Sequence, residues 1–276
     1  MMMNLRYPVL ILLLCGFTQP SCAKEAALSW FRTTPLQLTL NALVRNQPKL
    51  AWQELITALD KHPMPHQYWQ PIKEQILSQT DCGKQLTSTK KPAAITLSII
   101  SRARFSALDH QIKLSAEQIT QTASFELREP SENIILSGHL NPNLSYQEWE
   151  TSDLLAKPEP GIYTLTIGQN SYDILISSYS TYQWLERSTS ESSLLNSKPP
   201  ELTNQCPPMT VFQQWFDAEY RQVGTQHALA SQTNQIHIPP EAVSEQAKFQ
   251  RVSARIFEYQ SDIKIEYLHR VAVPYR

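Results

Sequence analysis

The residues best suited to metal binding are His62, Met64 and His66, which lie within a five-residue segment. Imidazole and thioether groups are donors for copper and for other soft or borderline ions. Pro63 and Pro65 stiffen the segment into an extended stretch between helices, and nothing in the sequence makes the three side chains converge. The other histidines show no spacing typical of metal ligands: His110, His139, His227, His237 and His269. We therefore expect no metal and no cofactor, with a copper or zinc carrier as an alternative.

Residues for nucleophilic or acid–base catalysis do not assemble into a motif. Neither Gly-x-Ser-x-Gly nor His-Glu-x-x-His occurs, and glycine contributes only 6 residues, which disfavours phosphate-cradling loops. Acidic pairs occur at Glu126 and Glu129 and at Glu148 and Glu150, but such pairs are common in a chain with 25 acidic residues. A glycosidase needs two carboxyl groups at a defined separation, which sequence does not supply. We expect no catalytic residues and a non-enzymatic protein.

Aromatic side chains are the better candidates for binding. Tyr146 and Trp149 follow an Asn-Pro-Asn turn, and Tyr179, Tyr182 and Trp184 lie between a predicted strand and a polar segment. Exposed aromatic rings of this kind stack on sugars or anchor a protein partner. The alternative is that both groups fill the crease between two β domains.

The first 23 residues have the layout of a cleaved secretory signal. Arg6 precedes an apolar run at residues 9–14, and small residues at 21–23 supply a cleavage site. The apolar core is far shorter than the roughly 20 residues that span a bilayer. An uncleaved anchor, or a lipid on Cys15 or Cys22, remains an alternative, although the preceding residues fit a lipobox poorly. We expect a mature protein in the periplasm that is not an integral membrane protein.

Two cysteines, Cys82 and Cys206, remain once the leader is removed. In an oxidising compartment we expect them to form a disulfide that ties the helical region to the C-terminal part. Closing a loop of about 125 residues contributes about 4 to 5 kcal/mol in the chain-entropy model. A redox switch is the alternative, but the chain has no Cys-x-x-Cys motif.

The element that must position the candidate metal segment is a helical region at residues 28–83. Residues 34–35 offer an N-cap followed by proline, and Pro48, Pro63 and Gly83 separate or end the helices. Apolar residues then recur at helical spacing: Leu36, Leu40, Leu43 and Val44; Trp52, Leu55, Ile56 and Leu59; Trp69, Ile72, Ile76 and Leu77. The hairpin resembles a single tetratricopeptide-type unit, but no second copy occurs, so we expect a three-helix cap rather than a repeat array.

Alternating apolar and polar residues predict strands in the rest of the chain, which makes the fold class α+β. Residues 92–180 predict a small immunoglobulin-like β-sandwich, with residues 161–167 and 172–176 as an antiparallel pair joined by a Gly-Gln-Asn turn. Residues 181–208 are rich in Ser, Pro, Asn and Thr, which predicts a polar linker or a long loop. Residues 209–276 predict a second β domain, and one bent β domain is the alternative to two.

The charge balance narrows the class of partner. The formal net charge is −1 and no block of basic residues occurs, which argues against nucleic acid. A hydrophobic content of 41% supplies enough apolar material for a folded core. We expect an ordered protein whose partner is an envelope protein or a glycan.

Four short segments resemble an uncharacterised family of exported Gram-negative proteins. They are Ser29-Trp30-Phe31, Thr34-Pro35-Leu36, Asp81-Cys82-Gly83 and the strand at residues 161–166. Members of this family are often encoded beside an envelope-sensing histidine kinase system. The resemblance implies a periplasmic protein linked to envelope homeostasis, and it carries no activity and no site residues.

These observations predict a periplasmic interaction or accessory protein of the bacterial cell envelope, possessing no catalytic site. The alternative is a glycan-binding or glycan-processing protein that uses the aromatic residues as platforms.

Overall fold

A computed structural model describes a large part of the chain: residues 34–86, 94–103, 108–181, 183–189, 191, 193–200, 206–230, 234–239 and 245–273. The expected signal at residues 1–23 lies outside these residues. Residues 34–276 fall into one compact unit. Among the described residues, no helix combines the length and the apolar character needed to span a membrane.

Three helices open the described chain, as the apolar spacing predicts: α1 (Gln37–Val44), α2 (Pro48–Lys61) and α3 (His66–Ser78). Pro48 occupies the first turn of α2, where its missing N–H costs no hydrogen bond. Leu55, Trp69 and Ile76 bury their side chains in the core of this region. Helix α3 begins at His66, so Pro71 lies in the interior of the helix.

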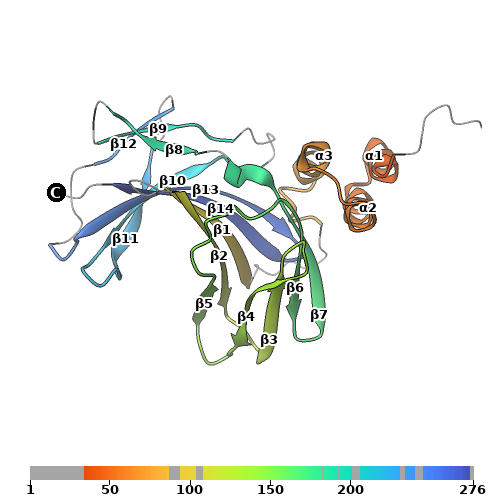
Figure 1. Ribbon diagram of the computed structural model, residues 1–276, viewed down its shortest axis with the longest axis horizontal. Helices are drawn as coiled ribbons and strands as arrows, with labels where there is room; N and C mark the ends of the chain where they lie inside the picture. Colours follow the sequence, from red (N-terminus) through yellow and green to blue (C-terminus); the bar gives the residue numbers. More distant parts are fainter. Residues whose placement is uncertain are drawn as a thin grey trace, which may run out of the picture. The chain divides into compact units, whose positions relative to one another are not determined.

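A seven-stranded sheet forms the centre of the fold (Figure 1). Its order is β11 (Gln222–Leu229), β10 (Thr210–Phe216), β13 (Phe249–Gln260), β14 (Ile263–Val273), β1 (Ile95–Ala103), β2 (Leu108–Glu117) and β5 (Tyr146–Glu150). All neighbours are antiparallel except β1 and β14, which pair in parallel. The tight turn at residues 261–262, where both residues have positive φ, joins the two longest strands, β13 and β14.

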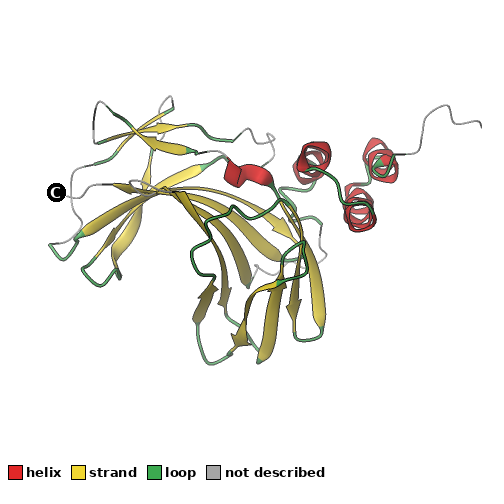
Figure 2. Ribbon diagram, viewed as in Figure 1, coloured by secondary structure: helices red, strands yellow, loops and turns green. Residues whose placement is uncertain are grey.

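Two smaller antiparallel sheets lie against one face of the large sheet (Figure 2). One has the order β4 (Ile134–Leu140), β3 (Ala123–Arg128), β6 (Gly161–Ile167) and β7 (Asn170–Ile176). The other has the order β12 (Gln235–His237), β9 (Leu194–Ser197) and β8 (Leu185–Arg187), and a short 3-10 helix, η1 (Ser178–Thr181), precedes it. One apolar core joins all three sheets, because Leu97, Leu165 and Leu195 belong to the same cluster of buried side chains.

The α+β class is confirmed, but the division of the β part differs from the prediction. Strands β1, β2 and β5 from residues 92–180 and strands β10, β11, β13 and β14 from residues 209–276 share one sheet. The structure does not show an immunoglobulin-like sandwich, because this sheet continues across the expected boundary. Residues 181–208 contain β8 and β9 rather than only a linker, because Leu185, Leu194 and Leu195 are buried in the shared core.

The large sheet has two faces of different character. Alternate residues of each strand, such as Ile265 and Tyr267 of β14, point into the shared core. The sheet is strongly curved, and the two small sheets lie on its outer side (Figure 1). The residues that alternate with these core residues along each strand, such as Glu266 and Arg270, therefore lie on the inner, concave face of the sheet.

Candidate functional site

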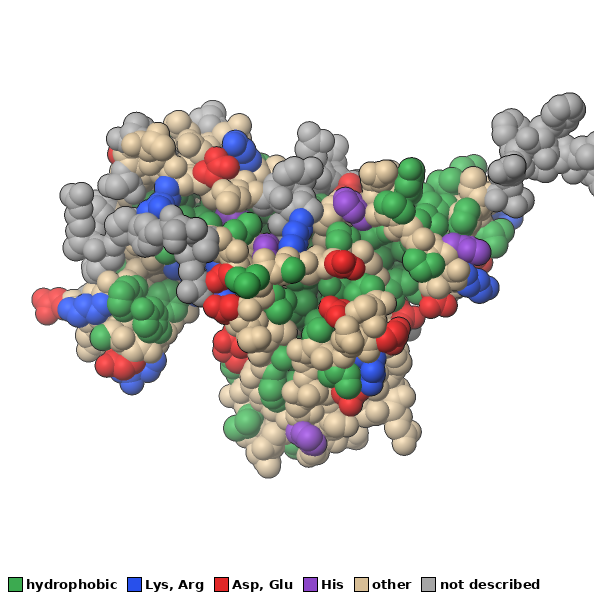
Figure 3. Space-filling view, in the orientation of Figure 1, with side chains coloured by type: hydrophobic (Ala, Val, Ile, Leu, Met, Phe, Trp, Pro, Cys, Tyr) green, Lys and Arg blue, Asp and Glu red, His purple; other side chains and the backbone are tan. Residues whose placement is uncertain are grey.

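The inner face of the curved sheet carries most of the charged side chains of its strands, and we call it the arginine face. It comprises the basic residues Arg102, Lys113, Arg251, Arg255, Lys264 and Arg270, the acidic residues Asp109, Glu117, Glu148, Glu150 and Glu266, and the aromatic residues Phe212, Phe216 and Phe257. Figure 3 shows acidic and basic side chains gathered at the hollow between the β11 lobe and the lobe of β3, β4 and β5. The strand register thus collects on one surface residues that are far apart in the sequence.

Ion pairs neutralise several of these charges. Glu266 lies 3.7 Å from Nη1 of Arg255 and 2.5 Å from Nζ of Lys264, both measured to its Oε1 atom. On the strands beyond β14, Nε of Arg102 donates to Oδ1 of Asp109 at 2.9 Å, and Nζ of Lys113 lies 3.0 Å from Oε2 of Glu148. These pairs orient side chains on the central strands β13 and β14 and on the strands from β1 to β5.

Arg251 and Arg270 differ from their neighbours because neither forms an ion pair with a described residue. Among the described residues, the hydrogen bond of Arg251 goes to the amide oxygen of Gln214, at 3.1 Å from Nη2. The Nε atoms of both arginines are buried and have no hydrogen-bond partner in the described part of the chain. Burial, reinforced by the charges of Arg270 and Arg102, lowers the pKa of Arg251 to about 9. The region between β13, β14 and β1 is therefore short of negative charge.

Aromatic rings support the cations of this face. The guanidinium of Arg251 lies 4.5 Å from the ring centre of Phe216, and that of Arg255 lies 5.3 Å from the ring centre of Phe212. Lys264 Nζ lies 4.8 Å from the ring of Phe257. Cation–π contacts favour the charged form and reduce the freedom of long side chains. The face thus presents cations that are held in place before any ligand arrives.

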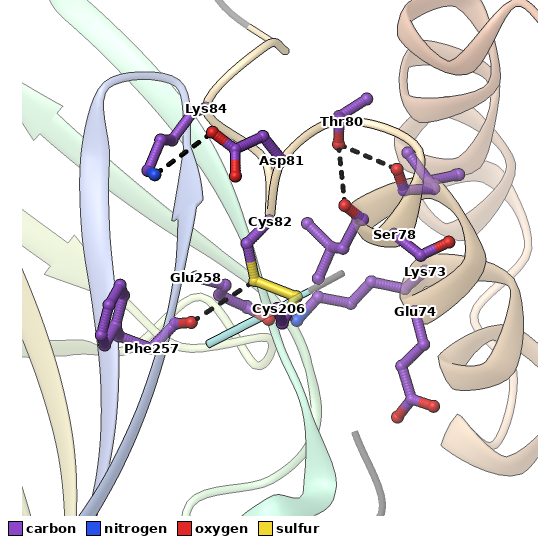
Figure 4. Close-up of a disulfide and its surroundings, with 12 residues drawn as sticks. Lys73, Glu74, Ser78, Thr80, Asp81, Cys82, Lys84, Cys206, Phe257 and Glu258 are labelled. Atoms are coloured by element: carbon purple, nitrogen blue, oxygen red, sulfur yellow. Dashed lines mark hydrogen bonds and ion pairs between the residues drawn. A yellow bond between two sulfur atoms is a disulfide. The ribbon is translucent and has the colours of Figure 1, made fainter. Parts of the chain in front are cut away.

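A buried ion pair fixes the helical region to the sheets (Figure 4). Lys73 of α3 is 0% exposed, and its Nζ lies 2.6 Å from Oε1 of Glu258 on β13. The same ammonium donates to the carbonyl oxygen of Leu175 at 2.7 Å and to Oγ of Ser177 at 2.6 Å. Burial lowers the pKa of Lys73, and the Glu258 carboxylate opposes that effect. Because every donor of Lys73 has an acceptor, we assign this network a structural role.

The predicted disulfide is confirmed, and it lies beside this network (Figure 4). Cys82 follows α3 and bonds to Cys206, with 4.9 Å between the two Cα atoms. The carbonyl oxygen of Cys82 accepts a hydrogen bond from the N–H of Tyr259 at 2.9 Å, where β13 has no β10 partner. The backbone of the helical region therefore continues the hydrogen bonding of the sheet edge.

A cleft of about 540 Å³ lies between α3, η1 and β8. Its lining is polar apart from Tyr179 and two prolines: Gln70, Glu74, Ser178, Tyr179, Gln183, Glu186, Lys198, Pro199 and Pro200. Tyr179 donates through its hydroxyl to Oε1 of Glu74 at 2.9 Å, and the same oxygen accepts a hydrogen bond from Nε2 of Gln70 at 3.0 Å. The cleft has room for a small molecule but holds no group of three metal-ligating side chains among the described residues.

The predicted aromatic candidates lie in three different environments. Trp184 is 1% exposed and donates through Nε1 to the carbonyl oxygen of Tyr179, which is also buried. Trp149 packs edge-on against Phe125, with ring centres 4.8 Å apart. Tyr146 is 47% exposed on β5, at the edge of the arginine face, and Tyr182 lies outside the described residues. Tyr179 and Trp184 are thus buried, Trp149 is partly buried against the core, and Tyr146 is accessible.

The histidine-methionine segment connects α2 and α3. His62 follows α2 and His66 begins α3, and no group of three His, Cys, Asp or Glu residues among the described residues is arranged to hold a metal ion. Met64 lies instead against the apolar core of the helices.

Sequence reasoning missed the arginine face although the sequence contains a signal for it. Arg251 and Arg255 are four residues apart in a β-prone segment, so they share a face of the strand. Arg102 of β1 and Arg270 of β14 pair in register. The net charge of the chain, −1, gives no indication of this cluster, because acidic residues balance its positive charge in the total.

These features define an α+β protein in which three helices precede a curved sheet with a charged inner face. The chain belongs to the family described as "Protein of unknown function (DUF2861)", whose model matches residues 30–276. The resemblance to an uncharacterised family is confirmed to that extent. No curated protein matches the chain.

Solved structures give only distant likenesses. A mutant thermostable endoglucanase from Alicyclobacillus acidocaldarius is 22% identical over 31% of this chain, with a TM-score of 0.18. The BSP domain of a biofilm associated protein is 9% identical over 72% of this chain, with a TM-score of 0.21. The chain covers 15% of the length of the endoglucanase and 35% of that of the biofilm protein. At these TM-scores the likenesses carry no argument about this protein.

Proposed function

We propose that this protein is a non-enzymatic interaction or accessory protein of the bacterial cell envelope that binds its partner through the arginine face. The observation that carries the proposal is the inner face of the large sheet, where cations and aromatic rings lie on a rigid, disulfide-linked scaffold. Arginine and aromatic residues are enriched in the energetically important centres of interfaces. A curved sheet with a filled core on its outer side can hold such residues in place, so they lose little conformational entropy on binding.

A periplasmic location is part of the proposal. The signal-like leader at residues 1–23 and the disulfide between Cys82 and Cys206 both support an oxidising compartment. The resemblance to proteins encoded beside an envelope-sensing kinase supports a role in envelope homeostasis. A fractionation of cells that finds the native protein in the cytoplasm would remove this part of the proposal.

Site-specific photocrosslinking tests the binding face. A photoreactive amino acid replaces Thr210, an exposed residue at the start of β10 beside the arginine face, and a matched control replaces exposed Tyr68 on α3. Crosslinking in living cells at native expression, followed by mass spectrometry, should capture one dominant envelope protein from position 210 and not from position 68. Equal capture from both positions, or turnover of a substrate by the purified protein, would contradict the proposal.

A glycan-binding protein is the second candidate, and Tyr146 is the observation that favours it. This ring is exposed at the edge of the arginine face, and its hydroxyl hydrogen-bonds to Oε2 of Glu148. The ring offers an apolar surface to a sugar ring, and the carboxylate offers an acceptor to the sugar hydroxyl groups. Sedimentation with peptidoglycan that is lost in Tyr146→Ala but retained in exposed Tyr220→Ala would favour this candidate, and unchanged sedimentation in both would reject it.

A further inference from the structure

We propose that Arg251 and Arg270, together with Arg102, form a binding site for the phosphate monoester group of an envelope ligand. This inference rests on the proposed use of the arginine face for binding and names the chemistry that the face recognises. No other group of described side chains combines buried cations with unused hydrogen-bond donors in this way.

The strand register brings the three arginines together. Arg270 of β14 lies directly opposite Arg102 of β1 and opposite Ser253 of β13. Arg251 lies opposite Ala272, which places it diagonally from Arg270 on the same face. Diagonal neighbours in a sheet lie about 7–8 Å apart, within reach of long side chains. Three guanidinium groups can thus meet at one point of the inner curve.

The charges at this point are not balanced by the acids around it. Arg102 already pairs with Asp109 and with Asp153. Glu150 is the acid whose field acts on both Arg251 and Arg270, yet it forms an ion pair with neither of them within the described residues. The nearby acids Glu148 and Glu266 are held by Lys113 and by Lys264. Arg251 and Arg270 therefore retain charge that an anion would neutralise.

Unused donors point to an oxygen-rich ligand. Four atoms are buried and find no hydrogen-bond partner among the residues that the structure describes: Nε of Arg251, Arg255 and Arg270, and Oγ of Ser253. Buried polar atoms of folded proteins normally have partners, so a group of four such atoms on one face indicates a missing acceptor. A phosphate monoester carries about −1.5 to −2 charges at pH 7 and three strong acceptor oxygens. Arginine forks match these oxygens in geometry better than lysine does.

The arginines are also held in place before binding. Phe216 lies 4.5 Å from the Arg251 guanidinium, and Gln214 accepts a hydrogen bond from its Nη2 atom. A side chain that is already ordered loses less entropy when the ligand binds. A carboxylate-bearing ligand would satisfy fewer donors and neutralise less charge, so the phosphate group is the better fit.

Titration calorimetry with glucose 6-phosphate, and with glucose as the uncharged reference, tests the site in the mature protein with its disulfide intact. We expect saturable binding of glucose 6-phosphate only, weakened at least tenfold in Arg251→Gln and in Arg270→Lys, which keeps the charge but loses the fork. Arg221→Gln is the matched control, because Arg221 is an exposed arginine at the end of the β10–β11 turn, directly before β11, and its partners Asp217 and Glu219 lie outside the arginine face. Circular dichroism verifies that each variant is folded.

A second arm distinguishes the source of the phosphate group. The protein is floated with phosphatidic acid vesicles, with phosphatidylcholine vesicles as the control. Flotation with phosphatidic acid that requires Arg251 identifies a lipid headgroup as the ligand. Binding of the soluble sugar phosphate without flotation identifies a free ligand. Absence of binding in both arms, or binding that is unchanged in Arg251→Gln and Arg270→Lys, would overturn the inference. If phosphate binding is absent but photocrosslinking at position 210 still captures a partner, the phosphate site is refuted while the proposed function stands.

Discussion

Replacing Lys73 tests the account of how the helical region is held to the sheets. Methionine matches the length of the lysine stem but removes the ammonium that contacts Glu258, Leu175 and Ser177. The Glu258 carboxylate, 4% exposed, would then lose its cationic partner while it stays in the interior. We therefore expect Lys73→Met to destabilise the protein more than any change at a surface ion pair.

The expected magnitude follows from the burial of both partners. Removing one member of a buried ion pair leaves an uncompensated charge and costs about 3–5 kcal/mol. Gln260 and Tyr267 still donate to Oε1 of Glu258, at 2.7 and 3.2 Å, which favours the lower half of that range. For a chain of this size, a loss of about 3 kcal/mol lowers the melting temperature by roughly 6–12 °C.

Urea unfolding of the oxidised protein measures this loss, and a double-mutant cycle isolates the pair. Glu258→Gln in the Lys73→Met background removes the orphaned charge and should recover most of the lost free energy of unfolding. Lys84→Met is the control, because the ion pair between Lys84 and Asp81 is half exposed and worth about 0–1 kcal/mol. Equal losses in Lys73→Met and Lys84→Met, or no recovery in the double variant, would refute the reasoning.

Three further predictions concern stability. Burial lowers the pKa of His269 to about 4, below its ordinary value of 6.5. The unfolded state therefore binds the proton more readily, and the free energy of unfolding should fall by about 3 kcal/mol from pH 6.5 to pH 4. Urea unfolding across this range should show a weaker pH dependence in His269→Leu, and an identical dependence would contradict the assignment. Replacing Cys82 and Cys206 by serine should cost about 4 to 5 kcal/mol by the same assay, because the bond closes a loop of 124 residues, and an unchanged unfolding midpoint would argue against this contribution. Gly83→Ala should lower the melting temperature strongly, because Gly83 has a φ of +89° and its added Cβ would overlap the carbonyl oxygen of Tyr259; a melting temperature within 1 °C of the wild-type value, about 0.3–0.5 kcal/mol, would show that the loop can yield.

Local patterns predicted the helices and most strands because the relevant signal lies within a few residues. Trp52, Leu55 and Leu59 bury one face of α2, and the alternation at residues 161–167 forms β6 as expected. Composition misled the prediction for residues 181–208, where serine and proline outnumber the few leucines that enter the core. A short strand needs only one or two buried side chains, which a composition average does not detect.

The sites were harder to predict because they depend on pairing between distant segments. Lys73 lies on the same helical face as Trp69 and Ile76, and a lysine on an apolar face is a signal of a buried partner. The sequence could not identify that partner, because Glu258 becomes its neighbour only through the register of β13. The arginine face has the same origin, since Arg102 meets Arg270 only when β1 pairs with β14.

The parallel pairing of β1 with β14 has a consequence for how the chain folds. β1 is the earliest strand of the large sheet and β14 is the last, and β13 joins the sheet only through β14 and β10. The central strands therefore cannot assemble until almost the whole polypeptide is present, and such non-local closure makes folding slow. A nascent or truncated chain that ends before Ile263 would leave the apolar edge of β1 open. Premature termination or proteolysis near the C-terminus should thus produce aggregation rather than a smaller functional domain.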